Sequence, residues 1–68
     1  MMRLKINGVE EELAVTTLRE LLEFRGIDPL ARFVAVAVNG SVVRRSEWSS
    51  KPLGPGDDVE IVRPFSGG

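Results

Sequence analysis

The chain has 68 residues, a formal net charge of −1, and neither cysteine nor histidine. A chain of this length forms one small domain, and its 43% apolar and 28% charged residues are typical of a globular protein. The composition provides no thiol nucleophile, no imidazole base and no disulfide, which argues against self-contained catalysis and excludes a thiolate or imidazole metal site.

The charges are mixed along the chain, so the sequence offers no basic field for nucleic acid or for an anionic membrane. The longest apolar run, residues 33–38, is too short to span a bilayer, and no targeting segment is recognisable at the N-terminus. We therefore expect a soluble, cytoplasmic protein. The run Glu10-Glu11-Glu12 is either a solvated face or a docking patch for a basic partner.

The first elements predicted in chain order form a β-hairpin. Leu4 and Ile6 alternate with charged residues, which indicates a half-buried strand. Asn7-Gly8 then suits a type I′ turn, because both central residues of that turn need positive φ. In the returning strand Val9, Leu13 and Val15 are expected on the core side, with Glu11 as the exception.

A helix is predicted from Thr17 to Arg25, where Leu18, Leu21 and Leu22 recur at helical spacing. Thr17 and Glu20 have the spacing of a capping box, and Gly26 is suited to end the helix. The three leucines are predicted to lie in the core, and Phe24 is a further candidate.

Three more strands are expected after the helix. Residues 33–38 are apolar on both faces, which favours a strand inside the sheet, and Asn39-Gly40 predicts a second hairpin into Val42 and Val43. A short irregular or single-turn segment follows, in which Trp48 either closes one end of the core or serves as an anchor for a partner. The turn residues 54–57 then lead into a last strand through Val59 and Ile61.

The C-terminal residues Pro64, Phe65, Ser66, Gly67 and Gly68 form the candidate site. Pro64 lacks an N–H, so the last strand should end there and release a short tail. Glycines without Cβ can pass through a narrow channel, which leaves the carboxylate of Gly68 accessible to chemistry. The alternative is a frayed terminus or a remnant of cloning.

This order of elements resembles the ubiquitin-like β-grasp proteins, and within them the ThiS family of sulfur carriers of thiamin biosynthesis. The resemblance covers the whole chain, and its more specific elements are the Arg-x-x-Trp pattern and the Gly-Asp entry to the last strand. The matching residues are Asn7-Gly8, Thr17-Leu18, Leu21-Leu22, Val36-x-Val38-Asn39-Gly40, Arg45-x-x-Trp48, Leu53-x-x-Gly56-Asp57-x-Val59-Glu60-Ile61-Val62 and Gly67-Gly68.

The resemblance implies an α+β fold, with a mixed sheet of about five strands and one main helix packed on one face. The β-grasp domain would comprise residues 1–63 and the flexible tail residues 64–68, with the first and last strands adjacent and parallel.

The resemblance also implies a carrier protein and not an enzyme. A ThiF-type adenylyltransferase would use ATP and magnesium to adenylate the carboxylate of Gly68, and sulfur would then displace AMP to give a thiocarboxylate. A ThiG-type thiazole synthase would receive the sulfur, and a donor such as a cysteine desulfurase would supply it. The chain itself would bind no cofactor and no metal.

Three alternatives remain open from the sequence: a molybdopterin-type sulfur carrier, a ubiquitin-like protein modifier, and a non-catalytic β-grasp interaction domain. A further hypothesis concerns the sheet face opposite the helix. Ala35, Ala37 and Val62, with Glu60 beside them, are expected on that face and are candidate docking residues for the partners. Alternatively, these residues only fill a twisted sheet.

Overall fold

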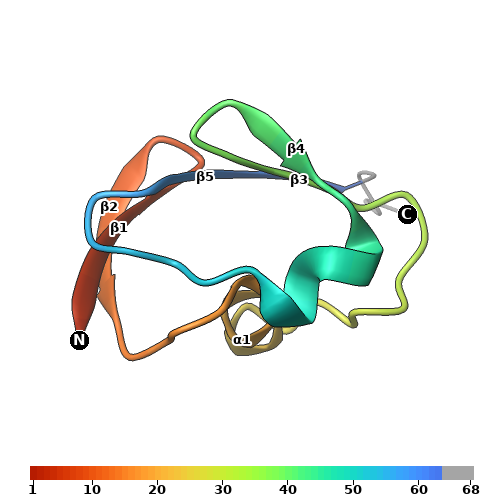
Figure 1. Ribbon diagram of the computed structural model, residues 1–68, viewed down its shortest axis with the longest axis horizontal. Helices are drawn as coiled ribbons and strands as arrows, with labels where there is room; N and C mark the ends of the chain where they lie inside the picture. Colours follow the sequence, from red (N-terminus) through yellow and green to blue (C-terminus); the bar gives the residue numbers. More distant parts are fainter. Residues whose placement is uncertain (64–68) are drawn as a thin grey trace.

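The computed structural model describes residues 1–63, which form one mixed sheet with a helix packed beneath it (Figure 1). The five strands lie in the order β2-β1-β5-β3-β4, so the last strand in the sequence occupies the centre. The elements are β1 (Met2–Ile6), β2 (Val9–Leu13), α1 (Leu18–Phe24), β3 (Ala35–Val38), β4 (Ser41–Val43), the 3-10 helix η1 (Arg45–Ser50) and β5 (Asp58–Val62).

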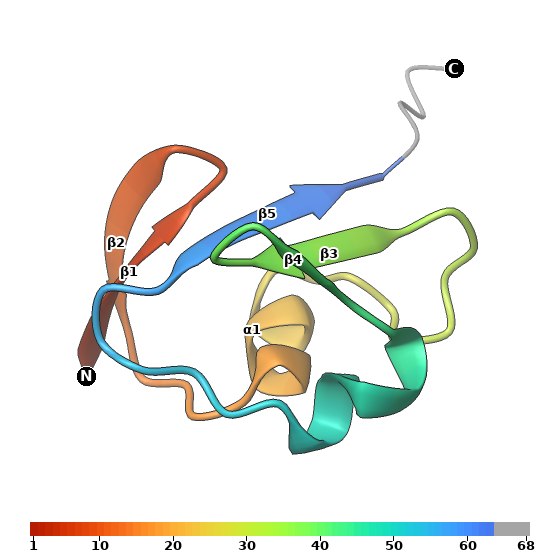
Figure 2. The same cartoon turned by 45° about the horizontal axis from the view of Figure 1, so that its top comes forward.

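The strand directions confirm the predicted β-grasp architecture. β1 pairs antiparallel with β2 and parallel with β5, and β3 pairs antiparallel with both β5 and β4 (Figure 2). The first and last strands are therefore adjacent and parallel, as the resemblance implied.

Both predicted hairpins are present, and their turns have the predicted backbone. Asn7 and Gly8 have φ angles of 50° and 84°, and Asn39 and Gly40 have 51° and 83°. Two successive positive φ angles are typical of a type I′ turn, and its twist matches that of the paired strands. These local requirements explain why Asn-Gly occurs at both turns.

The capping box of α1 is also confirmed. Glu20 N–H donates to Thr17 Oγ1 at 3.2 Å, and the Glu20 carboxylate accepts from Thr17 N–H at 3.1 Å. The same carboxylate accepts from the hydroxyl of Thr16 at 2.6 Å and from Thr16 N–H at 2.7 Å. These hydrogen bonds to the carboxylate lower the pKa of Glu20, because each of them favours the charged carboxylate. The bond from the Thr16 hydroxyl has the largest effect, and those from the N–H groups of Thr16 and Thr17 add to it.

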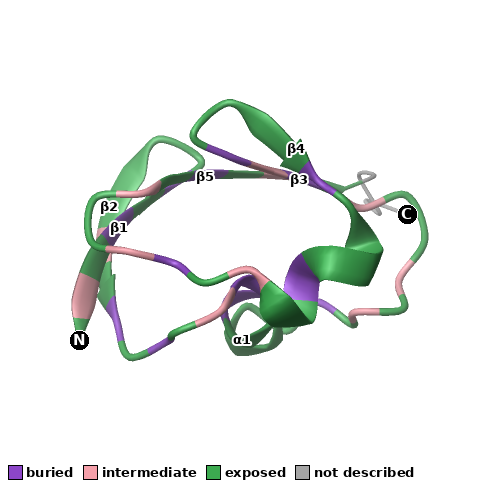
Figure 3. Cartoon of the chain, in the orientation of Figure 1, coloured by how far each residue is buried: buried purple, intermediate pink, exposed green. Residues whose placement is uncertain are grey.

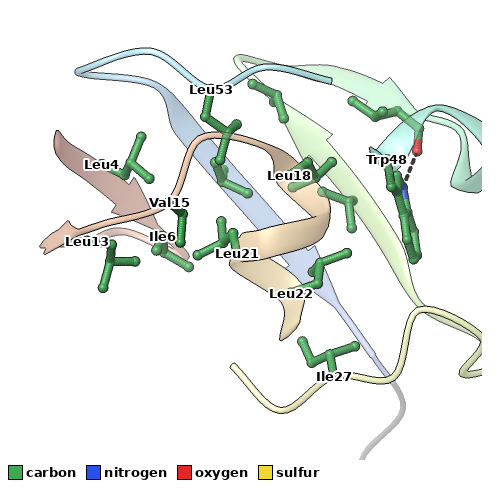
Figure 4. Packing of buried hydrophobic residues seen from close by; sticks show 14 residues of the cluster. Leu4, Ile6, Leu13, Val15, Leu18, Leu21, Leu22, Ile27, Trp48 and Leu53 are labelled. Carbon is green, nitrogen blue, oxygen red and sulfur yellow. Dashed lines mark hydrogen bonds between the residues drawn. The ribbon is translucent and has the colours of Figure 1, made fainter. Parts of the chain in front are cut away.

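The core lies between the sheet and α1 and is closed at one end by Trp48. Leu18, Leu21 and Leu22 are fully buried, as predicted, and Trp48 is 2% exposed. Trp48 Nε1 donates to the carbonyl of Val43 at 3.0 Å, so the buried indole has a partner (Figure 4). The complete cluster is Leu4, Ile6, Leu13, Val15, Leu18, Leu21, Leu22, Ile27, Val36, Val38, Val43, Trp48, Leu53 and Val59.

Two predicted core residues lie at the surface instead. Phe24 is 64% exposed on the last turn of α1, and Val9 is 60% exposed at the start of the edge strand β2. The edge strand β2 is exposed over most of its length (Figure 3). Glu11 lies two residues along β2 from each of Val9 and Leu13 and forms an ion pair with Arg25, the C-cap residue of α1. At this part of the sheet the end of α1 therefore presents the charged side chain of Arg25 and not an apolar surface.

The strand predicted at residues 33–38 was too long. β3 begins at Ala35, while Phe33 has a φ of 62° and is 79% exposed. A positive φ is incompatible with an extended strand, so the apolar Phe33 belongs to the connection between α1 and β3. The segment after β4 is likewise a six-residue 3-10 helix, longer than the single turn expected.

Candidate functional site

The candidate site begins at β5, the central strand that leads to the C-terminal tail (residues 64–68). The five tail residues of the sequence prediction, Pro64 to Gly68, lie outside the described residues. The structure defines the position of β5, the strand that leads to these residues, and of the surfaces around the end of β5.

Both Asn-Gly turns hold β5 with their asparagine side chains. Asn7 Oδ1 accepts from Ile61 N–H at 2.7 Å, and Asn39 Oδ1 accepts from Asp58 N–H at 2.9 Å. Asn39 Nδ2 also donates to Asp57 Oδ1 at 3.0 Å, and its backbone N–H donates to the Asp58 carbonyl at 2.7 Å. One hairpin thus fixes the start of β5 and the other fixes the part nearest the tail.

The turn before β5 is built by Gly54-Pro55-Gly56-Asp57. Asp57 N–H donates to the Gly54 carbonyl at 3.1 Å, and Gly56 has a φ of 86°. Proline followed by a residue with positive φ is the pattern of a type II turn, which explains the glycine. The Asp57 carboxylate accepts from Gly54 N–H at 2.8 Å and so braces the turn from which β5 starts.

The sheet face opposite α1 brings the four predicted docking residues together. Ala35 lies opposite Val62, and Ala37 lies opposite Glu60, in the register of β3 and β5. Their neighbours Val36 and Val59 are buried on the core side, so these four residues share the outer face. The alternation of side chains along β3 and β5 thus puts these four residues on one face, and their role in docking stays a prediction.

Sequence reasoning missed a further member of this face, Val42 on β4. It pairs with Ala37 and is 79% exposed. The alternation of Val42 with the buried Val43 after the Asn39-Gly40 turn was the available signal. We call Ala35, Ala37, Val42 and Val62 the outer apolar patch.

The remainder of the outer face is charged. Lys5 on β1 lies opposite Glu10 on β2 and Asp58 on β5. Arg3 forms exposed ion pairs with Glu12 at 3.0 Å and with Glu10 at 3.8 Å. The hydrogen bond to Glu12, with the charges of Glu12 and Glu10, raises the pKa of Arg3. Glu10 and Glu12 of the acidic run are thus exposed to solvent and paired with Arg3, beside the outer apolar patch.

The Arg-x-x-Trp element has a structural role that the sequence did not reveal. The guanidinium of Arg45 lies 4.7 Å from the centre of the Trp48 ring and donates to the carbonyls of Pro29 and Ala31. These contacts join η1 to the connection between α1 and β3. No sequence signal indicates them, because the partners are 14 and 16 residues away from Arg45.

Within residues 1–63, no group of three or more acidic side chains is arranged to hold a metal ion. None of the helices in this described part is long and apolar enough to cross a membrane.

Comparisons with known proteins agree with this architecture. The crystal structure of the thiamine biosynthesis protein ThiS from Geobacter metallireducens is 28% identical and superposes with a TM-score of 0.79, covering 98% of this chain and 100% of that one. The NMR solution structure of a thiamine biosynthesis protein from the same organism is also 28% identical, with a TM-score of 0.78 and coverage of 98% and 88%.

A search of curated protein sequences found no match. The model of the ThiS family, in contrast, matches residues 4–68, which is nearly the whole chain and includes both C-terminal glycines. The chain therefore belongs to the ThiS family.

Proposed function

We propose that this chain carries sulfur in thiamin biosynthesis, on the terminal carboxylate of Gly68. The observation that carries the proposal is the family match over residues 4–68, which extends through Gly67 and Gly68. The fold supports it, because the central strand β5 leads directly to the tail.

A carboxylate is a poor electrophile, so it must first be activated. In this proposal a ThiF-type adenylyltransferase with magnesium and ATP joins the Gly68 carboxylate to the α-phosphorus, and pyrophosphate leaves. A persulfide, formed by a donor such as a cysteine desulfurase, then attacks the acyl carbon with its outer sulfur and AMP leaves. A thiol reductant cleaves the sulfur–sulfur bond of the resulting acyl disulfide and is itself oxidised, which releases the thiocarboxylate. The resulting thiocarboxylate gives its sulfur to a ThiG-type thiazole synthase.

The residues of the chain would deliver the reacting group and supply no acid or base. With neither histidine nor cysteine in the sequence, the catalytic groups would come from the partners. Gly67 and Gly68 would fit a narrow channel because they lack Cβ. The carrier would thus act as a co-substrate.

The folded domain would provide most of the binding energy. Fixing one backbone residue costs about 1–2 kcal/mol, so ordering the five tail residues costs on the order of 5–10 kcal/mol. Two glycines make few compensating contacts. We therefore assign docking to the outer apolar patch, where Val62 is 64% exposed, together with the neighbouring Glu60.

Intact-protein mass spectrometry of the chain from its own cells tests the proposal. Replacement of one oxygen by sulfur at the C-terminus is expected when thiamin is withheld. Ladders of target conjugates would instead indicate a protein modifier, and dependence on molybdopterin demand would indicate that pathway. An unmodified terminus under thiamin demand would favour an interaction domain.

Two tail variants locate the reacting group. Deletion of Gly68 moves the carboxylate back by up to about 3.6 Å, whereas Gly67→Val keeps its position and adds a branched side chain. Both should abolish ATP–pyrophosphate exchange by the ThiF-type enzyme while the melting temperature stays unchanged. Normal exchange with either variant would contradict a reaction at Gly68 in a narrow channel.

A further inference from the structure

Residues 28–34, the later part of the connection between α1 and β3, expose two large apolar side chains. We call this segment the α1–β3 loop. Leu30 is 82% exposed and Phe33 is 79% exposed, and neither belongs to the core cluster. Exposed apolar surface that does not serve the core is a candidate interaction site.

The loop nevertheless has a fixed conformation. Asp28 accepts from Leu30 N–H through its carboxylate and from Ala31 N–H through its carbonyl, each at 2.8 Å. Arg45 binds the carbonyls of Pro29 and Ala31 from the other side. The rigid fork of its guanidinium suits two acceptors at once.

Arg45 in turn packs against a buried residue of the core, Trp48. Its guanidinium lies 4.7 Å from the centre of the ring of Trp48, which is 2% exposed. The φ of 62° at Phe33 is strained for an aromatic residue and persists only where the surroundings impose it. The chain thus holds Phe33 outward in an unfavourable backbone conformation.

The loop lies at the end of the molecule toward which β5 points (Figure 2). Arg32 and Val34 of the loop line the same surface hollow as Arg63, the residue that precedes the tail. Ala35, which follows the loop, pairs with Val62 at the end of β5. The loop and the start of the tail are therefore neighbours.

The length of the tail decides which surface its partner can reach. Five fully extended residues span at most about 18 Å, whereas the molecule is 33 Å long. A protein that holds Gly68 in its active site must bring its surface against this end of the domain. The loop lies where that contact has to form, since its residues Arg32 and Val34 share a hollow with Arg63.

We propose that the α1–β3 loop is a second docking surface, beside the outer apolar patch, for the enzyme that adenylates the tail. Phe33 and Leu30 would insert into an apolar depression next to the channel mouth, and acidic groups at its rim would face Arg32 and Arg63. Aromatic and arginine side chains are enriched at protein interfaces. Arg45 is a positioning residue: it binds the carbonyls of Pro29 and Ala31 and so holds the loop in the conformation that exposes Phe33. This inference rests on the proposed adenylation of Gly68.

The first test varies the concentration of the carrier in ATP–pyrophosphate exchange, with the ThiF-type enzyme from the same genome. Phe33→Ala should raise the KM for the carrier about tenfold or more, because an anchor is lost, while kcat changes little. Phe24→Ala is the matched control, since Phe24 is 64% exposed on α1 and should leave the KM unchanged.

Phe33→Gly separates the side chain from folding. Glycine accepts the φ of 62° without strain, so this variant should melt at or above the wild-type temperature and still show the raised KM. A wild-type KM in both Phe33 variants would overturn the loop inference alone. Absence of exchange with the wild-type chain would overturn the proposed function instead, so the two failures are distinguishable.

The second test combines Arg45→Lys with Phe33→Ala. Lysine keeps the charge and loses the fork that binds two carbonyls, so the single variant should raise the KM. If Arg45 acts through Phe33, the double variant has the KM of Phe33→Ala alone. Multiplied effects in the double variant, or a wild-type KM in Arg45→Lys, would overturn the positioning role.

Discussion

Replacement of Leu21 by alanine is the sharpest test of the packing between α1 and the sheet. Leu21 is fully buried within the core cluster. Burying a leucine side chain is worth about 1.5–3 kcal/mol, and the cavity left by its removal adds to the loss, so a total of about 3 kcal/mol is expected. Domains gain roughly 0.05–0.15 kcal/mol per residue, which gives this 68-residue chain about 3–10 kcal/mol in all.

Urea denaturation measures the loss. With a slope of about 1 kcal/mol per molar urea, Leu21→Ala should lower the midpoint by about 3 M. Phe24→Ala on the same helix is the control, since its ring is 64% exposed and alanine is the better helix former. A loss below about 1 kcal/mol for Leu21→Ala, or an equal loss in both variants, would refute the placement of this helix face in the core.

Three further predictions concern the caps, turns and outer face. The hydrogen bonds that lower the pKa of Glu20 stabilise the fold fully above the ordinary pKa of 4.5, and this contribution is lost as the pH falls through the lower folded value. Glu20→Gln should therefore reduce the melting temperature at pH 7, and the reduction should become smaller as the pH falls below 4.5; an equal reduction at every pH would contradict the cap. Asn39→Asp should lower the melting temperature more than Asn7→Asp at pH 7, because Asn39 Nδ2 donates to the Asp57 carboxylate; the reverse order would contradict that contact. Glu60→Lys, beside the outer apolar patch, should slow adenylation at an unchanged melting temperature, and normal activity would remove this face from the docking surface.

Elements fixed by neighbouring residues could be predicted from the sequence. The Asn-Gly turns need two positive φ angles, and the box formed by Thr17 and Glu20 needs residues three positions apart. Both requirements are local, so the pattern of residue types was sufficient. The outer-face positions also followed, because side chains alternate along β3 and β5.

Features that depend on contacts distant in sequence could not be predicted. Phe33 looks like a core residue in an apolar run, yet Arg45 binds the preceding part of the loop and β3 begins only after it. Asn7 was recognised as a turn residue, but its bond to Ile61 joins positions 54 residues apart. A side chain that serves both a local turn and a distant strand shows only its local role in the sequence.

The central place of β5 connects the fold with the proposed chemistry. Pairing with β1 and β3, and the side chains of Asn7 and Asn39, hold β5 along its length, so the last described residues before the tail have a defined position. Because ordering the tail in a channel costs on the order of 5–10 kcal/mol, the surfaces beside its first residue must supply the compensating contacts. The outer apolar patch adjoins that point through Val62, and the α1–β3 loop adjoins it through Val34. Two contact surfaces on either side of the strand end would also orient the tail, so that binding energy from the folded domain brings Gly68 to the reacting phosphate.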